Sequence, residues 1–249
     1  MSSSFRVVIP VRYGSSRLPG KPLFTFQHKP IIEHVYRNAC ESDAKSVLIA
    51  TDDERIAEAV AKFDAPVCMT SCEHMSGTDR ITEAVELQGW SDDEIVVNLQ
   101  GDEPQMPAAN IKQVAELLLQ SPDADIGTLC HRIHTIQEYE DPNIVKVTKN
   151  SVNRALYFSR SSLPYIRNVD VKVLKENTVY RHVGIYSYRV NYLKKFIKMP
   201  VSALEKIERL EQLRALENGD QIVIDECIEH PGIGVDTMDD YHRLKVGEK

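Results

Sequence analysis

The sequence predicts an α/β fold with a mostly parallel sheet covered by helices and a mixed-sheet extension. Short apolar runs alternate with amphipathic helical patterns up to about residue 125. Apolar runs without polar alternation are typical of strands buried on both faces, as in parallel sheets covered by crossover helices. Beyond about residue 125, strand-like runs follow one another with fewer helices between them, which indicates the mixed-sheet extension.

The elements of the first half alternate along the chain. We expect strands at 5–9, 47–50, 66–69 and 94–98, and helices at 30–40, 54–62 and 79–88. Ligands of such sheets bind beyond the carboxyl ends of the strands. The polar loops that follow the strands should therefore converge on one crevice; they are 11–21, 51–53 and 100–103.

The second half is predicted to hold four more strands and one long helix. The strands are expected at 126–130, 144–148, 155–158 and 183–188, with a turn at 149–153 and a polar loop at 169–178. The helix is expected at 202–218, with Gly219 as its stop. Its apolar residues should face inward; they are Leu204, Ile207, Leu210 and Leu213.

Composition excludes several classes of protein. The chain has 249 residues, 42% of them apolar, which is enough for a sizeable core, and the whole length reads as a single domain. It lacks the run of about 18 apolar residues that a membrane helix needs. The start lacks a signal-peptide core, and the five cysteines lack disulfide spacing, so we expect a cytoplasmic protein. The net charge of −7 argues against general nucleic-acid binding.

The most informative segment is the loop after the first strand, within 9–23. It carries three cations, Arg12, Arg17 and Lys21, together with Ser15 and two glycines. Guanidinium and ammonium groups bind phosphate oxygens, and glycine lets the backbone approach a ligand closely. The spacing of the glycines matches neither a P-loop nor a dinucleotide fingerprint. The loop predicts a site for a polyanion; the alternative is a solvated basic loop.

Two acidic positions are candidate metal ligands. Asp102 and Glu103 follow the buried strand at 94–98, and Mg²⁺ prefers one or two carboxylates together with substrate phosphates. Asp102 is the better candidate because it comes first after the Gly101 turn. Asp236 follows two glycines that allow a sharp turn. The alternative for each is a capping role, and Thr237 with Asp240 has the spacing of a capping box.

Other polar groups have both a functional and a structural interpretation. The segment 76–80 starts a helix, where it can bind an anion or act only as a cap. Asp52 ends a strand and either contacts a ligand or starts the next helix. Arginine and histidine in the second half suit a small acidic substrate, although scattered surface arginines are the ordinary explanation. The polar cluster of the second half that could bind such a substrate consists of Arg160, Arg167, Arg181, His182 and Tyr186. Glu211 and Gln212 either flank the apolar stripe of their helix within a site or are solvated.

Eight segments in order resemble those of the 3-deoxy-manno-octulosonate cytidylyltransferases, bacterial enzymes that activate a sugar acid. They are 9–23, 50–53, 76–80, 97–104, 155–160, 181–186, 210–214 and 234–237. The resemblance implies a nucleotide-diphospho-sugar transferase type of fold and a homodimer. It implies transfer of CMP from CTP to the anomeric hydroxyl of 3-deoxy-D-manno-octulosonate (Kdo), which yields CMP-Kdo and pyrophosphate for lipopolysaccharide biosynthesis. Residues from 1 to about 125 would form the nucleotide-binding half, and 126–249 the half for sugar-acid binding and dimerisation.

The resemblance also implies roles for individual residues. Asp102 and Asp236 would hold Mg²⁺, and with Arg17 and Lys21 they would form the catalytic set. The nucleotide would be bound by Arg12, Ser15, Arg17, Lys21, Asp52, Ser76, Thr78, Arg80 and Gln100. The sugar acid would be bound by Arg160, His182, Tyr186, Glu211 and Gln212.

The chain departs from the family pattern after Arg160. Relatives often carry an aspartate where this chain has Ile166, and the following loop at 168–178 also differs. Two alternatives therefore remain open. One is a cytidylyltransferase for another sugar acid, such as sialic acid or an amino variant of Kdo. The other is a nucleotide-binding regulator without catalysis, against which the presence of both Asp102 and Asp236 argues.

Overall fold

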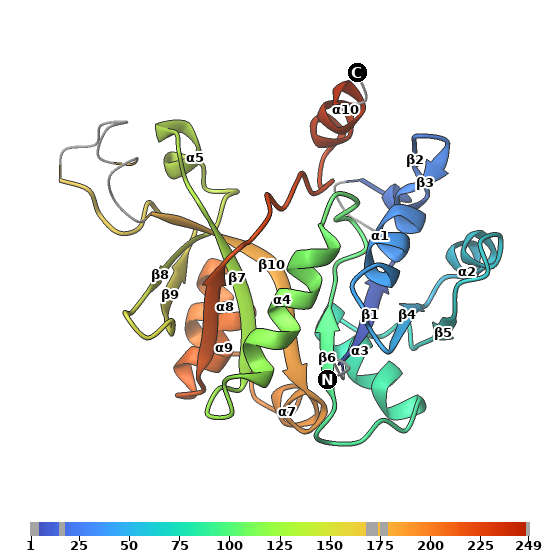
Figure 1. Cartoon of the computed structure of the whole chain (residues 1–249), viewed down its shortest axis with the longest axis horizontal. Coiled ribbons are helices and arrows are strands. Elements are labelled where there is room, and N and C mark those ends of the chain that lie inside the picture. Colours follow the sequence, from blue (N-terminus) through green and yellow to red (C-terminus); the bar gives the residue numbers. More distant parts are fainter. Residues whose placement is uncertain (1–4, 15–17, 168–173, 175–178, 248–249) are drawn as a thin grey trace.

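A nine-stranded mixed sheet crosses the part of the chain that the computed structural model describes, namely residues 5–14, 18–167, 174 and 179–247 (Figure 1). Seven strands follow the order β11-β7-β10-β6-β1-β4-β5, β8 pairs with β10, and β9 pairs with β8. The strands are β1 (Phe5–Val11), β4 (Ser46–Thr51), β5 (Val67–Met69), β6 (Ile95–Asn98), β7 (Ile126–Arg132), β8 (Lys146–Lys149), β9 (Ala155–Ser159), β10 (Tyr180–Arg189) and β11 (Ile222–Glu226).

The first half of the sheet is parallel. β1 pairs in parallel with β4 and with β6, and β4 pairs in parallel with β5. The consecutive residues Val7, Val8 and Ile9 of β1 are all fully buried. Consecutive side chains of a strand point to opposite faces, so both faces of the sheet are covered. This explains why the strand shows no polar alternation.

β10 joins the two halves of the sheet. It lies antiparallel between β6 and β7, and β7 pairs in parallel with β11. Its register against β7 shifts between Val183 and Tyr186. A mixed region therefore follows the parallel one, and the predicted fold class is confirmed. The predicted strands are all present, with boundaries that differ by a few residues.

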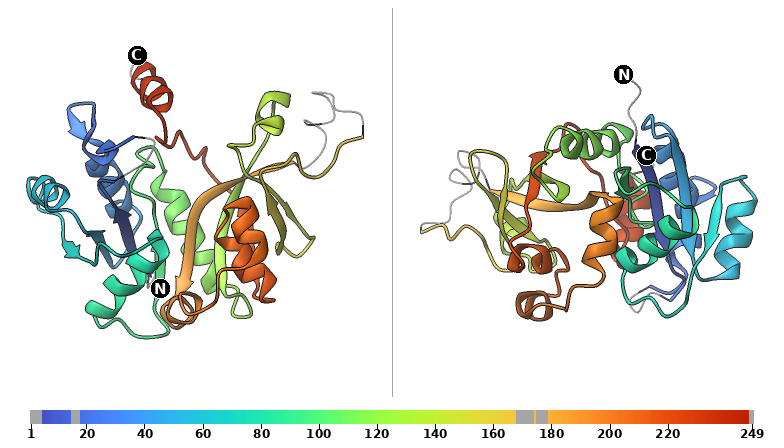
Figure 2. Two further views of the ribbon diagram at one scale, coloured as in Figure 1. Left: turned by 180° about the vertical axis from the view of Figure 1, so that it is seen from behind. Right: turned by 90° about the horizontal axis from the view of Figure 1, so that it is seen from below.

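Helices cover both faces of the sheet (Figure 2). α1, α2, α4 and α10 contribute to the hydrophobic cluster on one face, and α3, α7 and α9 to that on the other. Among the described residues no helix is long and apolar enough to span a membrane. The helices are α1 (Ile31–Cys40), α2 (Glu54–Ala61), α3 (Gly77–Leu87), α4 (Ala108–Leu119), α5 (Ile136–Glu140), α7 (Val190–Phe196), α8 (Ala203–Glu208), α9 (Gln212–Glu217) and α10 (Met238–Val246), with the short 3-10 helix η1 (Lys21–Leu23) and the hairpin β2 (Thr25–Phe26)–β3 (Lys29–Pro30).

The prediction of one helix over 202–218 is wrong. α8 and α9 are separate, because Arg209 adopts a left-handed conformation with φ of 54°. Ile207, expected to face inward, is 78% exposed. Gly219 has φ of 80° just beyond α9, as expected for a helix stop. Most of the predicted loop at 169–178 lies outside the described residues.

α4 and β11 were not predicted from the sequence. α4 buries Ile111, Val114, Ala115 and Leu118, which have the i, i+3, i+4, i+7 spacing of an amphipathic helix. The signal was therefore present in the sequence. β11 is a short run, Ile222–Glu226, whose periodicity does not distinguish a strand from other buried segments.

Candidate functional site

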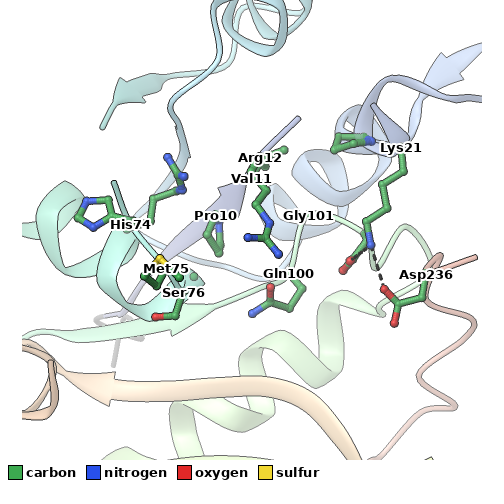
Figure 3. A pocket seen from close by; sticks show the side chains of 14 residues that line it. Pro10, Val11, Arg12, Lys21, His74, Met75, Ser76, Gln100, Gly101 and Asp236 are labelled. Carbon is green, nitrogen blue, oxygen red and sulfur yellow. Dashed lines mark hydrogen bonds and ion pairs between the residues drawn. The ribbon is translucent and has the colours of Figure 1, made fainter. Parts of the chain in front are cut away.

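A cavity of about 240 Å³ lies at the carboxyl ends of β1 and β6. Figure 3 shows Lys21 and Asp236 on one side of it, His74 and Ser76 on the other, and Gln100 between them. Two of the three loops predicted to converge, those after β1 and β6, do so here, and the segment before α10 joins them. Residues 51–53, the third loop, are not among the lining residues. The lining residues are Pro10, Val11, Arg12, Lys21, Pro22, His74, Met75, Ser76, Gly77, Arg80, Gln100, Gly101, Asp102 and Asp236.

Lys21 bridges the two predicted metal ligands. Its side chain is only 11% exposed, and its Nζ donates to Asp236 Oδ1 at 3.0 Å and to Asp102 Oδ2. Burial by itself lowers the pKa of the ammonium, but the two carboxylates outweigh burial and raise that pKa above its ordinary value. Lys21 is therefore a cation at neutral pH.

Asp102 and Asp236 come from distant segments and face the same cation. The backbone N–H of Val235 donates to the carbonyl oxygen of Asp102 at 2.8 Å, which aligns the two segments. Because a positive group already lies between the carboxylates, their arrangement suits a cation. Two carboxylates beside the predicted polyanion loop match the preference of Mg²⁺, which keeps waters and substrate oxygens as its other ligands. No group of three or more His, Cys, Asp or Glu side chains able to hold a metal occurs within the described ranges.

Glu103 belongs to this acidic group, although the sequence analysis favoured Asp102 alone. Burial, together with the charges of Asp102 and Asp236, raises the pKa of Glu103 to about 8. A Cβ added at Gly234 would approach Glu103 Oε1 to 2.8 Å, so the glycine permits this close contact. In the sequence, the only indication that Glu103 belongs to this group was its position next to Asp102. Its burial depends on the segment around Gly234, which no local pattern reveals.

The start of α3 forms another wall of the cavity. Ser76 caps the helix in a capping box with Asp79, as the structural interpretation of this segment predicted. Arg80 lines the cavity and is 3% exposed. Its guanidinium lies 3.1 Å from Asp52 Oδ2 and donates to Thr70 Oγ1 at 2.6 Å. Asp52 thus holds Arg80 and is not among the residues that line the cavity.

A second cavity, of about 260 Å³, adjoins the first. Gly77 and Gln100 line both cavities. Gln100 Nε2 donates a hydrogen bond to Asn98 Oδ1 at 3.0 Å, which orients the Gln100 amide. Two ligands bound in the two cavities would therefore meet at Gln100. The second cavity is lined by Gly77, Thr78, Asn98, Gln100, Ile126, Gly184, Tyr186, Tyr188, Phe196, Glu211 and Gln212.

Glu211 connects the two cavities. Its carboxylate accepts hydrogen bonds from Ser76 Oγ at 3.3 Å and from Thr78 Oγ1 at 3.1 Å. Burial raises the pKa of Glu211 to about 6. Both hydroxyls belong to the start of α3, so this carboxylate links α9 to the wall of the first cavity. The pair at 211–212 is thus not a solvated helix face, because both residues line the second cavity.

Two predicted sugar-acid residues lie outside the lining of both cavities. Arg160 donates from Nε to the carbonyl oxygen of Glu208 at 2.9 Å. His182 lies 3.0 Å from Thr128 Oγ1, and its ring packs against Tyr186, which lines the second cavity. Burial lowers the pKa of His182 to about 3, so its imidazole is neutral at physiological pH. The proposed roles of both residues remain predictions.

Two residues of the predicted anion loop, Ser15 and Arg17, lie outside the described residues. The structure adds several lining residues that the sequence analysis did not select. Tyr188 had a usable signal, because it follows Tyr186 by two positions on one strand and so lies on the same face. Met75 had none. The remaining additions include His74, Asn98 and Phe196.

Comparisons with known proteins give consistent matches. A family model described as cytidylyltransferase matches residues 6–222. The chain is 49% identical over 248 residues to the 3-deoxy-manno-octulosonate cytidylyltransferase of Hahella chejuensis, covering 98% of this chain and 97% of that protein. It is 50% identical over 249 residues to the protein of the same name from Cellvibrio japonicus, with coverage of 98% and 97%.

Solved structures match as well. CMP:2-keto-3-deoxy-manno-octonic acid synthetase complexed with CTP is 40% identical and matches with a TM-score of 0.89, covering 98% of each chain. A cytidylyltransferase from Leptospira borgpetersenii, 16% identical, matches with a TM-score of 0.62 over 97% of this chain and 85% of that one. At that identity the second match speaks for the fold alone.

The fold and the cavities together define the class of this protein. A cavity with buried cations and paired carboxylates, at the carboxyl ends of a parallel sheet and beside a second cavity, is that of a nucleotidyltransferase. The full-length matches narrow this class. The chain belongs to the cytidylyltransferase family, among the 3-deoxy-manno-octulosonate cytidylyltransferases. The resemblance and the enzyme class predicted from the sequence are confirmed.

Proposed function

We propose that the chain transfers CMP from CTP to the anomeric hydroxyl of Kdo, with release of pyrophosphate. The observation that carries this proposal is the pair of adjoining cavities with Gly77 and Gln100 in common. One cavity has the cations and carboxylates that suit a metal-bound triphosphate. The other has the hydroxyl and amide groups that suit a polyol acid. The names of the relatives from Hahella chejuensis and Cellvibrio japonicus support the same substrates.

The reaction requires no protein nucleophile. The oxygen of the sugar hydroxyl forms a bond to the α-phosphorus as the bond from that phosphorus to the pyrophosphate oxygen breaks, and the hydroxyl proton is released to water. Arg12 and Lys21, which line the first cavity, would bind the polyphosphate and neutralise the charge that develops on pyrophosphate. Gln100 lines both cavities, so it would orient one reactant against the other. Catalysis thus depends on positioning and charge neutralisation.

Mg²⁺ would be held by Asp102 and Asp236. When bound there, the ion supplies Lewis-acid activation of phosphate oxygens. The contribution of the chain is the pair of carboxylates and the ammonium of Lys21, which lies between them. We propose that Lys21 moves from the carboxylates to the triphosphate when metal and CTP bind, because both carboxylates are then neutralised by the ion.

The second cavity would bind the sugar acid. Gln212 offers an amide, and Tyr186 and Glu211 offer a hydroxyl and a carboxylate. The ring of His182 packs against that of Tyr186, and because it is neutral it contributes no charge to the cavity. Arg160 is held by Glu208, so engagement of the carboxylate of the acid requires a change of its partners.

The departure at Ile166 gives little support to a different acid. Ile166 packs against a small hydrophobic cluster that contains Ile133 and Tyr139. It lines neither cavity. We therefore propose Kdo as the substrate and lipopolysaccharide biosynthesis as the context. We also propose that the enzyme is a cytoplasmic homodimer; the exposed apolar side chains of Leu156, Tyr165 and Ile207 in its second half are consistent with a subunit contact.

The test is pyrophosphate release with CTP, Mg²⁺ and Kdo, with UTP and sialic acid in parallel assays. Release with CTP plus Kdo alone is the expected result. Activity with another sugar acid and none with Kdo would support the cytidylyl transfer but contradict Kdo as the substrate. Tight CTP binding without release for any acid would overturn the proposal in favour of a nucleotide-binding regulator.

A further inference from the structure

The segment 226–236, here named the strap, connects β11 to α10, and Asp236 is its last residue (Figure 1). Beyond Glu226 the strap contains neither helix nor strand. Its backbone N–H and C=O groups therefore lack the partners that secondary structure provides, and other groups must satisfy them. The position of Asp236 depends on which groups those are.

Two amide side chains of α4 bind the strap through paired hydrogen bonds. Asn110 Nδ2 donates to the carbonyl oxygen of Glu229 at 2.9 Å, and its Oδ1 accepts from the N–H of Glu229 at 3.1 Å. Gln113 repeats the pattern one helical turn later. Its Nε2 donates to the carbonyl oxygen of Glu226 at 2.8 Å, and its Oε1 accepts from the N–H of Ile228 at 3.1 Å.

A third amide binds the strap nearer to Asp236. Gln105 Oε1 accepts from the N–H of Ile233 at 3.0 Å. At Gly232, an added Cβ would lie 2.4 Å from Gln105 Cβ, so the strap passes in close contact with Gln105. Three residues after Gly232, the backbone N–H of Val235 donates to the carbonyl oxygen of Asp102. The contacts therefore continue from α4 to the metal carboxylates.

A side-chain amide suits such a strap well, because its donor and its acceptor are separate atoms. It offers a donor and an acceptor at fixed separation, as the edge of a β-strand does, whereas a carboxylate lacks the donor and an aliphatic side chain lacks both. Hydrophobic burial also anchors the strap, because Val235 is 1% exposed, but burial is not directional. Backbone bonds hold the two ends of the strap, from the N–H of Cys227 to the carbonyl oxygen of Cys130 and from the N–H of Val235 to that of Asp102, each at 2.8 Å. Between these ends, the amides are directional side-chain contacts that favour one register of the strap.

We propose that Asn110, Gln113 and Gln105 are positioning residues, whose amides set the register of the strap and thereby hold Asp236 opposite Asp102. This inference depends on the proposed function in one respect, the role of Asp236 as a metal carboxylate. Residues that orient metal ligands influence metal affinity by about 10- to 100-fold. The amides should therefore affect metal binding more than nucleotide binding.

The test uses the Asn110→Ala and Gln113→Ala variants of the full chain, with Gln120→Ala as the matched control. Gln120 is exposed at the end of the same helix and makes no contact with the strap among the bonds of the described residues. Calorimetry would measure Mn²⁺ affinity in the presence of CTP, and CTP affinity without metal. We expect Mn²⁺ affinity to fall about 10-fold in both variants, with CTP affinity unchanged.

Hydrogen exchange of residues 226–236 gives an independent measurement. Exchange should accelerate there in the two variants and remain at the wild-type rate in Gln120→Ala. Gln113 is less buried than Asn110, so its variant keeps the test informative if Asn110→Ala fails to fold. If the wild-type chain binds Mn²⁺ and both variants bind it with the same affinity, the positioning role is overturned. Absence of Mn²⁺ binding to wild type would overturn the metal assignment instead.

Discussion

At the scale of single residues, the site depends on charges placed against one another under partial burial. Lys21 is the clearest case, because its ammonium is almost enclosed and contacts both Asp102 and Asp236. Removing one partner of such a group leaves the other uncompensated, which costs more than the interaction itself contributed. Substitutions that preserve shape and alter charge are therefore the informative ones.

The substitution Asp102→Asn should lower turnover by at least about 10²-fold, because a metal acting as a Lewis acid contributes several kcal/mol to transition-state stabilisation. The fold should persist, since asparagine has the same shape. Pyrophosphate release across a Mg²⁺ titration measures the effect, and far-UV circular dichroism checks the fold. Asp239→Asn, on an exposed residue of α10, is the control and should behave as wild type. Near-normal turnover of Asp102→Asn would contradict the metal assignment.

Glu211 should make stability depend on pH. Its pKa is about 6 in the folded chain, raised by burial from an ordinary value of 4.5. Between these values the folded chain binds more protons than the unfolded chain, so the free energy of unfolding falls as pH rises. Glu211→Gln removes this effect. The stability of the variant relative to wild type should rise by about 1 kcal/mol across this window, after allowance for solvent screening.

Urea unfolding at pH values from 4.5 to 7.5 measures this difference. Glu86→Gln, on an exposed position of α3, is the matched control and should show no such trend. The loss of a hydrogen bond from Ser76 or Thr78 would change the free energy of unfolding of the variant by the same amount at every pH. It therefore does not affect the slope of the difference with pH. A flat difference between Glu211→Gln and wild type would contradict the raised pKa.

At the scale of elements, helix ends and breaks decide which residues reach the site. The break between α8 and α9 places Glu211 and Gln212 at the start of a new helix, where both line the second cavity. Arg209 makes this break with a positive φ. A continuous helix would direct these side chains differently. The capping box at Ser202 starts α8, so this part of the pattern followed a local rule.

Arg209→Gly should raise the free energy of unfolding by up to about 1 kcal/mol. A left-handed conformation costs about 1–2 kcal/mol for a residue with a Cβ, and the greater entropy of glycine in the unfolded chain offsets part of the gain. Lys206→Gly, at an exposed position inside α8, should lower it by about 1 kcal/mol. Urea denaturation compares the two. Equal destabilisation by both substitutions would argue against the break.

At the scale of the whole molecule, one sheet connects the parts that hold the two cavities. β10 comes from the second half of the chain and lies between β6 and β7. A fragment of residues 1–125 would therefore leave β6 with an open edge and remove part of the second cavity. This arrangement supports the proposal of a single domain.

Unfolding should therefore occur in one transition. Trp90, the single tryptophan, lies in the first half beneath the guanidinium of Arg6, and Cys130 is buried in β7 of the second half. Trp90 fluorescence, thiol reactivity of Cys130 and far-UV circular dichroism should give the same urea midpoint. Separate midpoints for Trp90 and Cys130 would indicate two units that unfold independently.

Local patterns in the sequence predicted the parallel strands, the basic loop after the first strand, the two candidate metal carboxylates and the cap at Ser76. These features depend on side-chain chemistry and spacing within a few residues. Only the tertiary structure decided which groups meet. Lys21 and Asp236 are 215 residues apart, and Ser76 and Glu211 are 135 apart. Such contacts depend on strand order and strap register, which follow from packing the whole chain, so no local pattern contains them.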